Sequence, residues 1–386
     1  MTTVPRTILL AAAVLVAATA CAPKQSPTAM PSAGPSAAPP TPTVLGPARV
    51  VEIEAEVDLP GSYVAPWYEF SDAQHGYALF QWCGDDGYDC TGRLLATADG
   101  GRTWQRRNLP VAKARGIQLY QSTPQQVIIW TDPAGYQLST DGGHTYGPAT
   151  EVMPRQHAGA LARYGLEWPG DNQGDPQLLE FATGRRLTVP DGFEVATAWT
   201  TPDSTVWVTR PGPPKRTART TDGGLTWQTI AVPEQPGRSV WSLSVLQSAD
   251  RRDTWLVGMQ DPPSTGGGTA VLRGSVLKAT GMPLLWRLAD AAWVPVPITG
   301  IEEQPNQQYT LAAAGDGLLA LAGPEDGVYL GARGLVRVPG TPRLDTVWLL
   351  PDGTLRGFSS DSREILLGVG SGADREWRRI SLEPTG

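Results

Sequence analysis

The chain of 386 residues carries 31 basic and 38 acidic side chains, which give a formal net charge of −7. Nucleic acids are bound through basic surfaces that neutralise phosphates, so this acidic balance argues against a nucleic-acid partner. The 44 glycines and 36 prolines favour a fold with many turns over one built from long helices.

Residues 1–20 have the features of an export signal. A single cation, Arg6, precedes an apolar run from Ile8 to Ala18, and small residues follow the run. This run of 11 residues is too short to cross a bilayer, which takes about 20. The adjoining Ala18-Thr19-Ala20-Cys21 resembles a bacterial lipobox, which implies that Cys21 becomes a lipid-modified N-terminus. The alternative is an ordinary export signal beside an incidental cysteine.

Residues 21–47 predict a tether between this anchor and a folded domain. Pro, Ala, Ser and Thr dominate the segment, so it lacks the apolar surface that a packed core requires. Its prolines favour an extended, semi-rigid spacer. We therefore expect a signal at 1–20, a tether at 21–47 and a single domain at 48–386. The domain would lie on the outer face of the cell membrane and contact it only through the lipid.

The two remaining cysteines, Cys83 and Cys90, enclose a short loop. Exported proteins favour disulfides, and Cys21 is committed to the lipid, so we expect these two to pair and pin the tip of a hairpin. The loop also contains Asp85, Asp86 and Asp89, whose spacing matches no known calcium loop. The sequence therefore predicts no metal site and no cofactor.

Three segments repeat almost the same eight residues, beginning at Thr97, Ser139 and Thr220. They resemble the Asp-box, S/T-x-D-x-G-x-T-W, of sialidase-like, sortilin-like and photosystem-assembly-factor-like propellers; Tyr146 replaces the tryptophan in the second. The pattern suits a tight hairpin, because the aspartate can accept backbone N–H bonds and glycine tolerates a positive φ. We expect these residues to have structural roles: Asp99, Gly101, Thr103, Trp104, Asp141, Gly143, Thr145, Asp222, Gly224, Thr226 and Trp227.

The spacing of the repeats predicts the number of blades. The first two boxes start 42 residues apart, and the third starts 81 residues later, which is close to two such steps. Degenerate copies are expected at 181–187, 279–286, 331–334 and 370–377. The total is seven repeats, and the expected fold is an all-β, seven-bladed β-propeller with four-stranded antiparallel blades. Six or eight blades remain alternatives.

The segments around the first box predict one complete blade, with strands at 67–70, 76–80, 94–96 and 104–107. Before them, residues 50–57 alternate between apolar and acidic side chains, as a half-buried strand does. We expect this strand to pair with the last blade and close the ring, since an open ring would expose a sheet edge. Whether it or the strand at 377–382 is outermost stays open.

The Asp-box resemblance raises one enzymatic alternative, a sialidase-like glycoside hydrolase. Such enzymes hold the substrate carboxylate with three arginines, the first of them in an F/Y-R-I-P segment that this chain lacks. No nucleophile or metal motif is present, and His75, His144 and His157 lie in no metal-binding pattern. The sequence favours a non-catalytic propeller over an enzyme.

The 14 tryptophans are mostly expected to pack inside the fold. Four belong to boxes or their degenerate copies, and six fall in predicted strands: Trp67, Trp130, Trp199, Trp207, Trp241 and Trp348. Trp168 and Trp293 have the weakest structural reason to be buried, so they are the candidate exposed contact residues. The sequence thus predicts a monomeric, lipid-anchored propeller that binds an envelope protein or a glycan at one face of the ring, away from the box hairpins.

Overall fold

A computed structural model describes thirteen stretches of the chain: residues 45–59, 64–84, 89–121, 123–167, 175–235, 239–260, 277–280, 282–301, 308–323, 327–332, 334–341, 343–359 and 364–385. The chain divides into a unit of residues 1–41 and a compact unit of residues 42–386. The predicted signal, Cys21 and the tether up to residue 44 lie outside the described residues.

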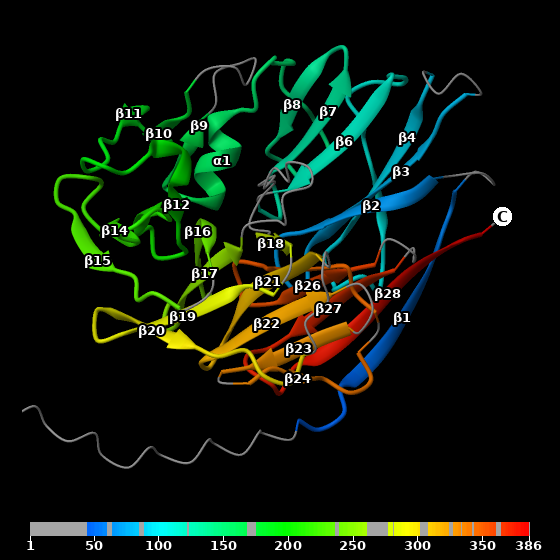
Figure 1. Ribbon diagram of the computed structural model, residues 1–386. Helices are drawn as coiled ribbons and strands as arrows, with labels where there is room; N and C mark the ends of the chain where they lie inside the picture. Colours follow the sequence, from blue (N-terminus) through cyan, green and yellow to red (C-terminus); the bar gives the residue numbers. More distant parts are fainter. Residues whose placement is uncertain are drawn as a thin grey trace, which may run out of the picture. The chain divides into compact units, whose positions relative to one another are not determined.

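The compact unit is a seven-bladed β-propeller, which confirms the predicted fold (Figure 1). The described residues contain one α-helix, α1 (Arg155–Leu161), and one short 3-10 helix, η1 (Val195–Thr197). Within this described part of the chain, neither helix is long and apolar enough to cross a membrane.

The regular blade is a four-stranded antiparallel sheet whose strands follow one another outward from the ring centre. Blade 1 contains β2 (Val64–Phe70), β3 (Gly76–Trp82), β4 (Thr91–Thr97) and β5 (Gln105–Arg107). Blade 4 contains β12 (Trp199–Thr200), β13 (Val206–Arg210), β14 (Arg216–Thr220) and β15 (Gln228–Ala231). Blade 5 contains β16 (Val240–Gln247), β17 (Thr254–Gln260), β19 (Leu284–Ala289) and β20 (Ala292–Val296).

The other four blades depart from four strands in the described residues. Blade 2 contains β6 (Gly116–Gln121), β7 (Val127–Asp132) and β8 (Gly135–Ser139), and blade 3 contains β9 (Tyr164–Glu167), β10 (Gln177–Glu180) and β11 (Arg185–Arg186). Blade 6 contains β18 (Leu277–Thr280), β21 (Gln308–Gly315), β22 (Leu318–Gly323), β23 (Gly327–Gly331) and β24 (Val336–Arg337). Blade 7 contains β25 (Thr346–Leu349), β26 (Leu355–Phe358), β27 (Ile365–Val369), β28 (Glu376–Pro384) and β1 (Arg49–Val57).

Strand β1 joins the start of the domain to the last blade, as predicted. It pairs in parallel with β28 and lies outside it, which answers the question of the outermost strand. Its apolar side chains, among them Ile53 and Val57, share one buried cluster with Tyr68 and Phe70 of blade 1. The strand therefore covers the interface where the last blade meets the first.

Strand β18 overturns one predicted repeat. The degenerate copy expected at 279–286 is not a hairpin between the last two strands of blade 5. Ala279 lies in β18, which leaves blade 5 and pairs with β21 at the inner edge of blade 6. The actual hairpin joins β19 to β20 through Asp290 and Ala291, both with positive φ. The copies expected near 181, 331 and 370 do lie between the last two strands of blades 3, 6 and 7.

Neighbouring blades pack face to face, and we call each such interface a seam. Clusters of buried apolar side chains fill the seams between blades 7 and 1, 1 and 2, 3 and 4, 4 and 5, 5 and 6, and 6 and 7. Among the described residues, no such cluster spans blades 2 and 3. One seam of the ring therefore differs from all the others.

A disulfide joins Cys83 to Cys90, as predicted, and it connects the ends of β3 and β4. Asp85 and Asp86 lie outside the described residues, whereas the Asp89 carboxylate accepts a 2.5 Å bond from the Lys113 ammonium. No group of His, Cys, Asp and Glu within the described ranges is arranged to hold a metal ion.

Candidate functional site

The two ends of the blades have different connections. In an antiparallel blade, the turn between strands one and two lies at the same end as the hairpin between strands three and four. This hairpin end holds all three repeated boxes, after β4, β8 and β14. The opposite end holds the disulfide loop and the connections between blades, including α1. Each end therefore has to be examined for a site separately.

At the hairpin end, the box aspartates are fully engaged in their own turns. The Asp222 carboxylate accepts bonds from the Thr226 hydroxyl at 2.6 Å, the Thr220 hydroxyl at 2.7 Å and the Thr226 amide at 3.0 Å. Asp99 and Asp141 accept the equivalent bonds. Hydrogen bonds from the Thr226 side chain and then its backbone hold the pKa of Asp222 well below its usual range. These carboxylates stay ionised and hold the hairpins.

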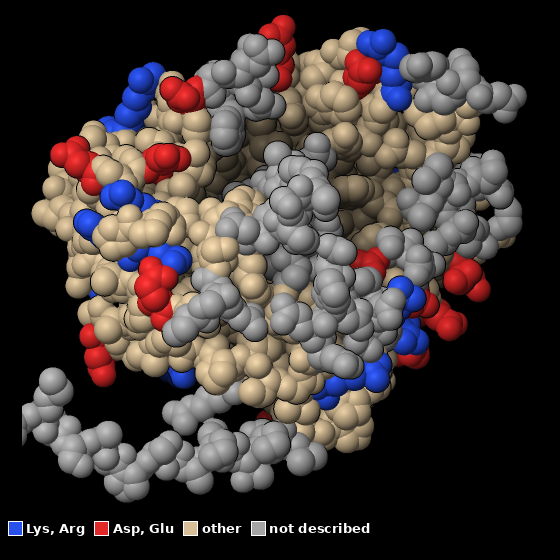
Figure 2. Space-filling view, in the orientation of Figure 1, with Lys and Arg blue, Asp and Glu red and all other residues tan. Residues whose placement is uncertain are grey.

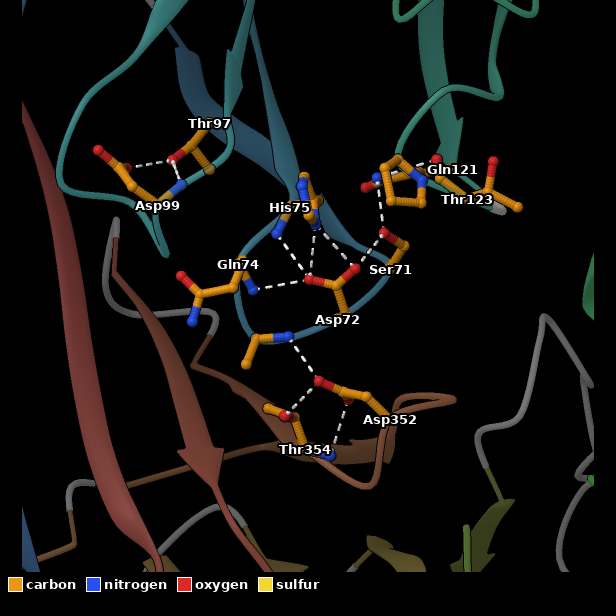
Figure 3. Close-up of polar contacts among 12 residues, drawn as sticks. Ser71, Asp72, Gln74, His75, Thr97, Asp99, Gln121, Thr123, Asp352 and Thr354 are labelled. Atoms are coloured by element: carbon orange, nitrogen blue, oxygen red, sulfur yellow. Dashed lines mark hydrogen bonds and ion pairs between the residues drawn. The ribbon is translucent and has the colours of Figure 1, made fainter.

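The turns between strands one and two lock neighbouring blades together at the same end (Figure 3). Asp352 of blade 7 accepts a 2.8 Å bond from the Ala73 amide of blade 1. Gln121 of blade 2 donates a 3.1 Å bond to the Ser71 hydroxyl of the same turn. Burial alone would raise the pKa of Asp72, but bonds from the Gln74 and His75 amides and the His75 ring outweigh it and lower the pKa.

A groove of about 290 Å³ lies between the first two box hairpins, and its lining includes His75, Tyr77, Asp99, Arg107, Asp141 and His144. The hydrogen bonds described above lower the pKa of Asp141, and those around Asp99 outweigh its burial and lower its pKa too. Burial raises the pKa of Tyr77 to about 12. Since neither carboxyl holds a proton near neutral pH, this groove contains no carboxylic general acid.

The seam between blades 2 and 3 is occupied in part by α1, which lies between β9 and the strands of blade 2 (Figure 1). Gly159 of α1 lies against the Phe181 side chain, and the Arg155 guanidinium makes two bonds of 2.6 and 2.7 Å to the Glu167 carboxylate. The helix is thus fastened to blade 3. Its His157 is 3% exposed, and burial lowers the pKa of that imidazole to about 4.

Blade 2 turns three aromatic side chains toward this seam: Tyr120, Trp130 and Tyr136. We call them the aromatic row. All three are half-buried. The Tyr136 ring centroid lies 6.2 Å from that of Tyr120 and 6.5 Å from that of Trp130, with interplanar angles of 49° and 54°. Figure 2 shows the surface hollowed between α1 and strands β6–β8.

Polar groups flank the aromatic row. Gln118 pairs across the sheet with Trp130, which pairs with Tyr136, and Tyr136 forms a bridge to Thr150. The Tyr120 hydroxyl donates a 2.6 Å bond to Gln118 Oε1, which orients that carboxamide. The row therefore combines apolar ring faces with uncharged hydrogen-bonding groups, an arrangement suited to binding rather than to acid–base chemistry.

One exposed tryptophan belongs to a different arrangement, between blades 7 and 1. Trp67 is 51% exposed, and its indole donates a 3.0 Å bond to Glu69. Glu69 also accepts a 2.5 Å bond from Arg356, whose guanidinium lies 4.7 Å from the centre of the Trp348 ring. This cluster ties β2 to β26.

The two tryptophans predicted to be exposed contact residues, Trp168 and Trp293, have different outcomes. Trp168 lies outside the described residues. The prediction that Trp293 is exposed is wrong: it is 2% exposed, its indole donates a 2.8 Å bond to the Thr217 hydroxyl, and its ring lies 5.5 Å from that of Trp207. It sits in β20, whose face packs on blade 4. Trp67 and Trp130 were expected in the core and are instead 51% exposed and half-buried.

No protein-family model matches the chain, and no curated protein matches it. Among solved structures, YCF48 bound to D1 peptide shares 14% identity at a TM-score of 0.41, covering 81% of this chain and 93% of that one. The propeller domain of the Trilobed protease from Pyrococcus furiosus shares 8% at 0.42, covering 80% and 95%. A GH74 enzyme of Niastella koreensis shares 10% at 0.31, covering 81% and 64%. Likeness of this degree carries no argument about function.

Proposed function

We propose that the protein is a lipid-anchored, extracytoplasmic propeller with Asp-box hairpins that binds an envelope protein or a glycan without catalysis. The observation that carries the proposal is the aromatic row, half-buried in the one seam without an apolar core cluster among the described residues. Large aromatic side chains that packing leaves accessible are typical of binding sites. The lipobox-like Cys21 supports the anchor.

The state of the hairpin carboxylates supports binding over glycoside hydrolysis. Most glycosidases other than sialidases need one carboxylic acid with a raised pKa beside a second, ionised carboxylate. In the groove between the first two hairpins, Asp99 and Asp141 both have lowered pKa values. A fluorogenic sialoside incubated with the purified protein should not be cleaved, because the chain lacks the F/Y-R-I-P segment that supplies the first arginine of a sialidase. Turnover would favour the sialidase-like alternative.

The anchor is tested by cell fractionation. The substitution Cys21→Ser should release the protein from membranes, because the acyl chains supply the membrane affinity. The double variant Cys83→Ser/Cys90→Ser removes the other two cysteines and should stay membrane-bound. Retention of the Cys21→Ser protein in the membrane fraction would refute lipidation at this residue.

The binding role is tested with envelope fractions of the producing cell. The soluble domain should be retained by an envelope extract. The triple variant Tyr120→Ala/Trp130→Ala/Tyr136→Ala should lose that retention while still unfolding in one cooperative transition above the assay temperature. Equal retention of the two proteins would exclude the aromatic row as the binding site.

A further inference from the structure

We infer that the aromatic row binds an uncharged glycan, with sugar rings stacked on Trp130 and Tyr136. The inference rests on the proposed binding function and specifies its ligand. It follows from three properties of the seam between blades 2 and 3: its shape, the ion pairs on its two sides, and the chemistry of the groups beside the rings.

The shape favours a narrow ligand. The rings of Tyr120, Trp130 and Tyr136 are tilted by 49° and 54°, so they form a curved surface and not a flat one. Each ring is also only partly exposed. A stable protein interface takes about 800 Å² from each partner, usually from a broad accessible surface. A row of three half-buried, mutually tilted rings suits a chain of sugars better.

Two ion pairs border the seam, one on each side. Arg115 donates a 2.9 Å bond to the Asp132 carboxylate at the end of β7, and Arg155 is held by Glu167 on the other side of the seam. No charge in these pairs is left to complement a carboxylate, a sulfate or a phosphate. A charged ligand would lose its hydration without a counter-ion, whereas an uncharged one would not.

The groups beside the rings match sugar hydroxyls. A pyranose has an apolar C–H face, which packs on an aromatic ring, and a rim of hydroxyls that both donate and accept. The Gln118 carboxamide and the Tyr120 hydroxyl lie at one side of the rings, and Thr150 lies at the other. These groups can exchange bonds with hydroxyls at either edge of a stacked sugar.

The experiment measures binding of the soluble domain to a glycan array. The array holds neutral glycans together with charged ones, both sialylated and uronate-containing. At least one neutral glycan should bind. For that glycan, Trp130→Ala and Tyr136→Ala should each raise the dissociation constant about tenfold, since ring stacking contributes on the order of 1.4 kcal/mol. Trp67→Ala is the matched control, because it removes an exposed tryptophan outside the row, and its affinity should not change.

The outcomes separate this inference from the proposed function. Binding confined to charged glycans, or a neutral glycan bound equally by Trp130→Ala, overturns the inference. If no neutral glycan binds but an envelope protein is captured and lost in the triple variant, the ligand is a protein and the binding function stands. If neither is captured, both fail. Thermal midpoints of the variants, measured alongside, show that a loss of binding is not a loss of fold.

Discussion

The two faces of blade 2 differ in their side chains and in how deeply these are buried. The face toward blade 1 presents aliphatic side chains that are almost completely buried, such as Leu119 and Ile129, both 0% exposed. The face toward blade 3 presents the half-buried Tyr120, Trp130 and Tyr136 beside Ile128, which is 0% exposed. The same three strands supply both faces, because successive side chains in a strand point to opposite sides.

This difference shows that closing the ring does not require every seam to be packed equally. Clusters of buried apolar residues fill six seams, and β1 adds a parallel strand where the last blade meets the first. No such cluster spans blades 2 and 3 in the described residues, and α1 lies between β9 and the strands of blade 2 (Figure 1). Under the proposed binding function, one seam serves recognition while the others provide stability.

The largest expected effect compares neighbouring residues of β7 that point to opposite faces. Ile129→Ala should lower the free energy of unfolding by about 4 kcal/mol, because it leaves a cavity in a filled seam. Trp130→Ala removes a larger side chain, yet it should cost only about 1.5 kcal/mol, because that ring is half-buried. Urea unfolding of both variants checks this. Equal losses would mean that the two seams are packed alike.

Acid should destabilise the seam between blades 2 and 3 through His157 of α1. Its pKa is about 4 in the fold, against 6.5 for an exposed histidine, so the unfolded chain binds the proton more readily. This contribution to stability is complete above pH 6.5 and is lost as the pH falls toward 4, by about 3 kcal/mol. Thermal midpoints across this range should fall steeply in the wild type and less in His157→Leu. An unchanged slope in the variant would assign the effect to other groups.

The parts of the fold that the sequence predicts are those with a local cause. Each box hairpin is held by bonds among residues at most four positions apart, such as Thr97, Asp99 and Thr103, so the motif alone specifies the turn. The Cys83–Cys90 bridge spans seven positions, and each strand of blade 1 pairs with the next strand along the chain. The distance between repeats then predicts how many such units the chain contains, which is seven blades.

The candidate site is harder to predict because it depends on how blades pack. Nothing in the repeat spacing predicts α1 or the crossing of β18 to blade 6, and β18 is the reason that the repeat expected at 279–286 failed. Trp293 and Trp130 both occupy strands, but one faces a filled seam and the other faces α1. The available signal was the alternation of Ile117 and Leu119 with Gln118 and Tyr120, which gives β6 one polar-aromatic face.

The hairpin end should respond to mutation in stability and not in binding. Asp99→Ala removes the acceptor for the Thr103 amide and hydroxyl, and we expect a loss of about 1.5 kcal/mol, as for a lost helix cap. Arg106→Ala, at an exposed position on β5, is the control and should stay within about 0.5 kcal/mol. Glycan affinity should be the same in both variants. A weakened affinity in Asp99→Ala would place the ligand at the hairpin end instead.

The smallest effect should come from Tyr120→Phe, which keeps the ring of the aromatic row and deletes its hydroxyl. The hydroxyl donates to Gln118 Oε1 at 2.6 Å near solvent, so unfolding free energy should change by no more than about 0.5 kcal/mol. The carboxamide would lose its fixed orientation, so affinity for the neutral glycan should fall about threefold, a loss that titration calorimetry can resolve. Because both faces of blade 2 keep their apolar packing in this variant, the change isolates recognition from stability. A stability loss as large as that of Ile129→Ala would show that the row belongs to the core after all.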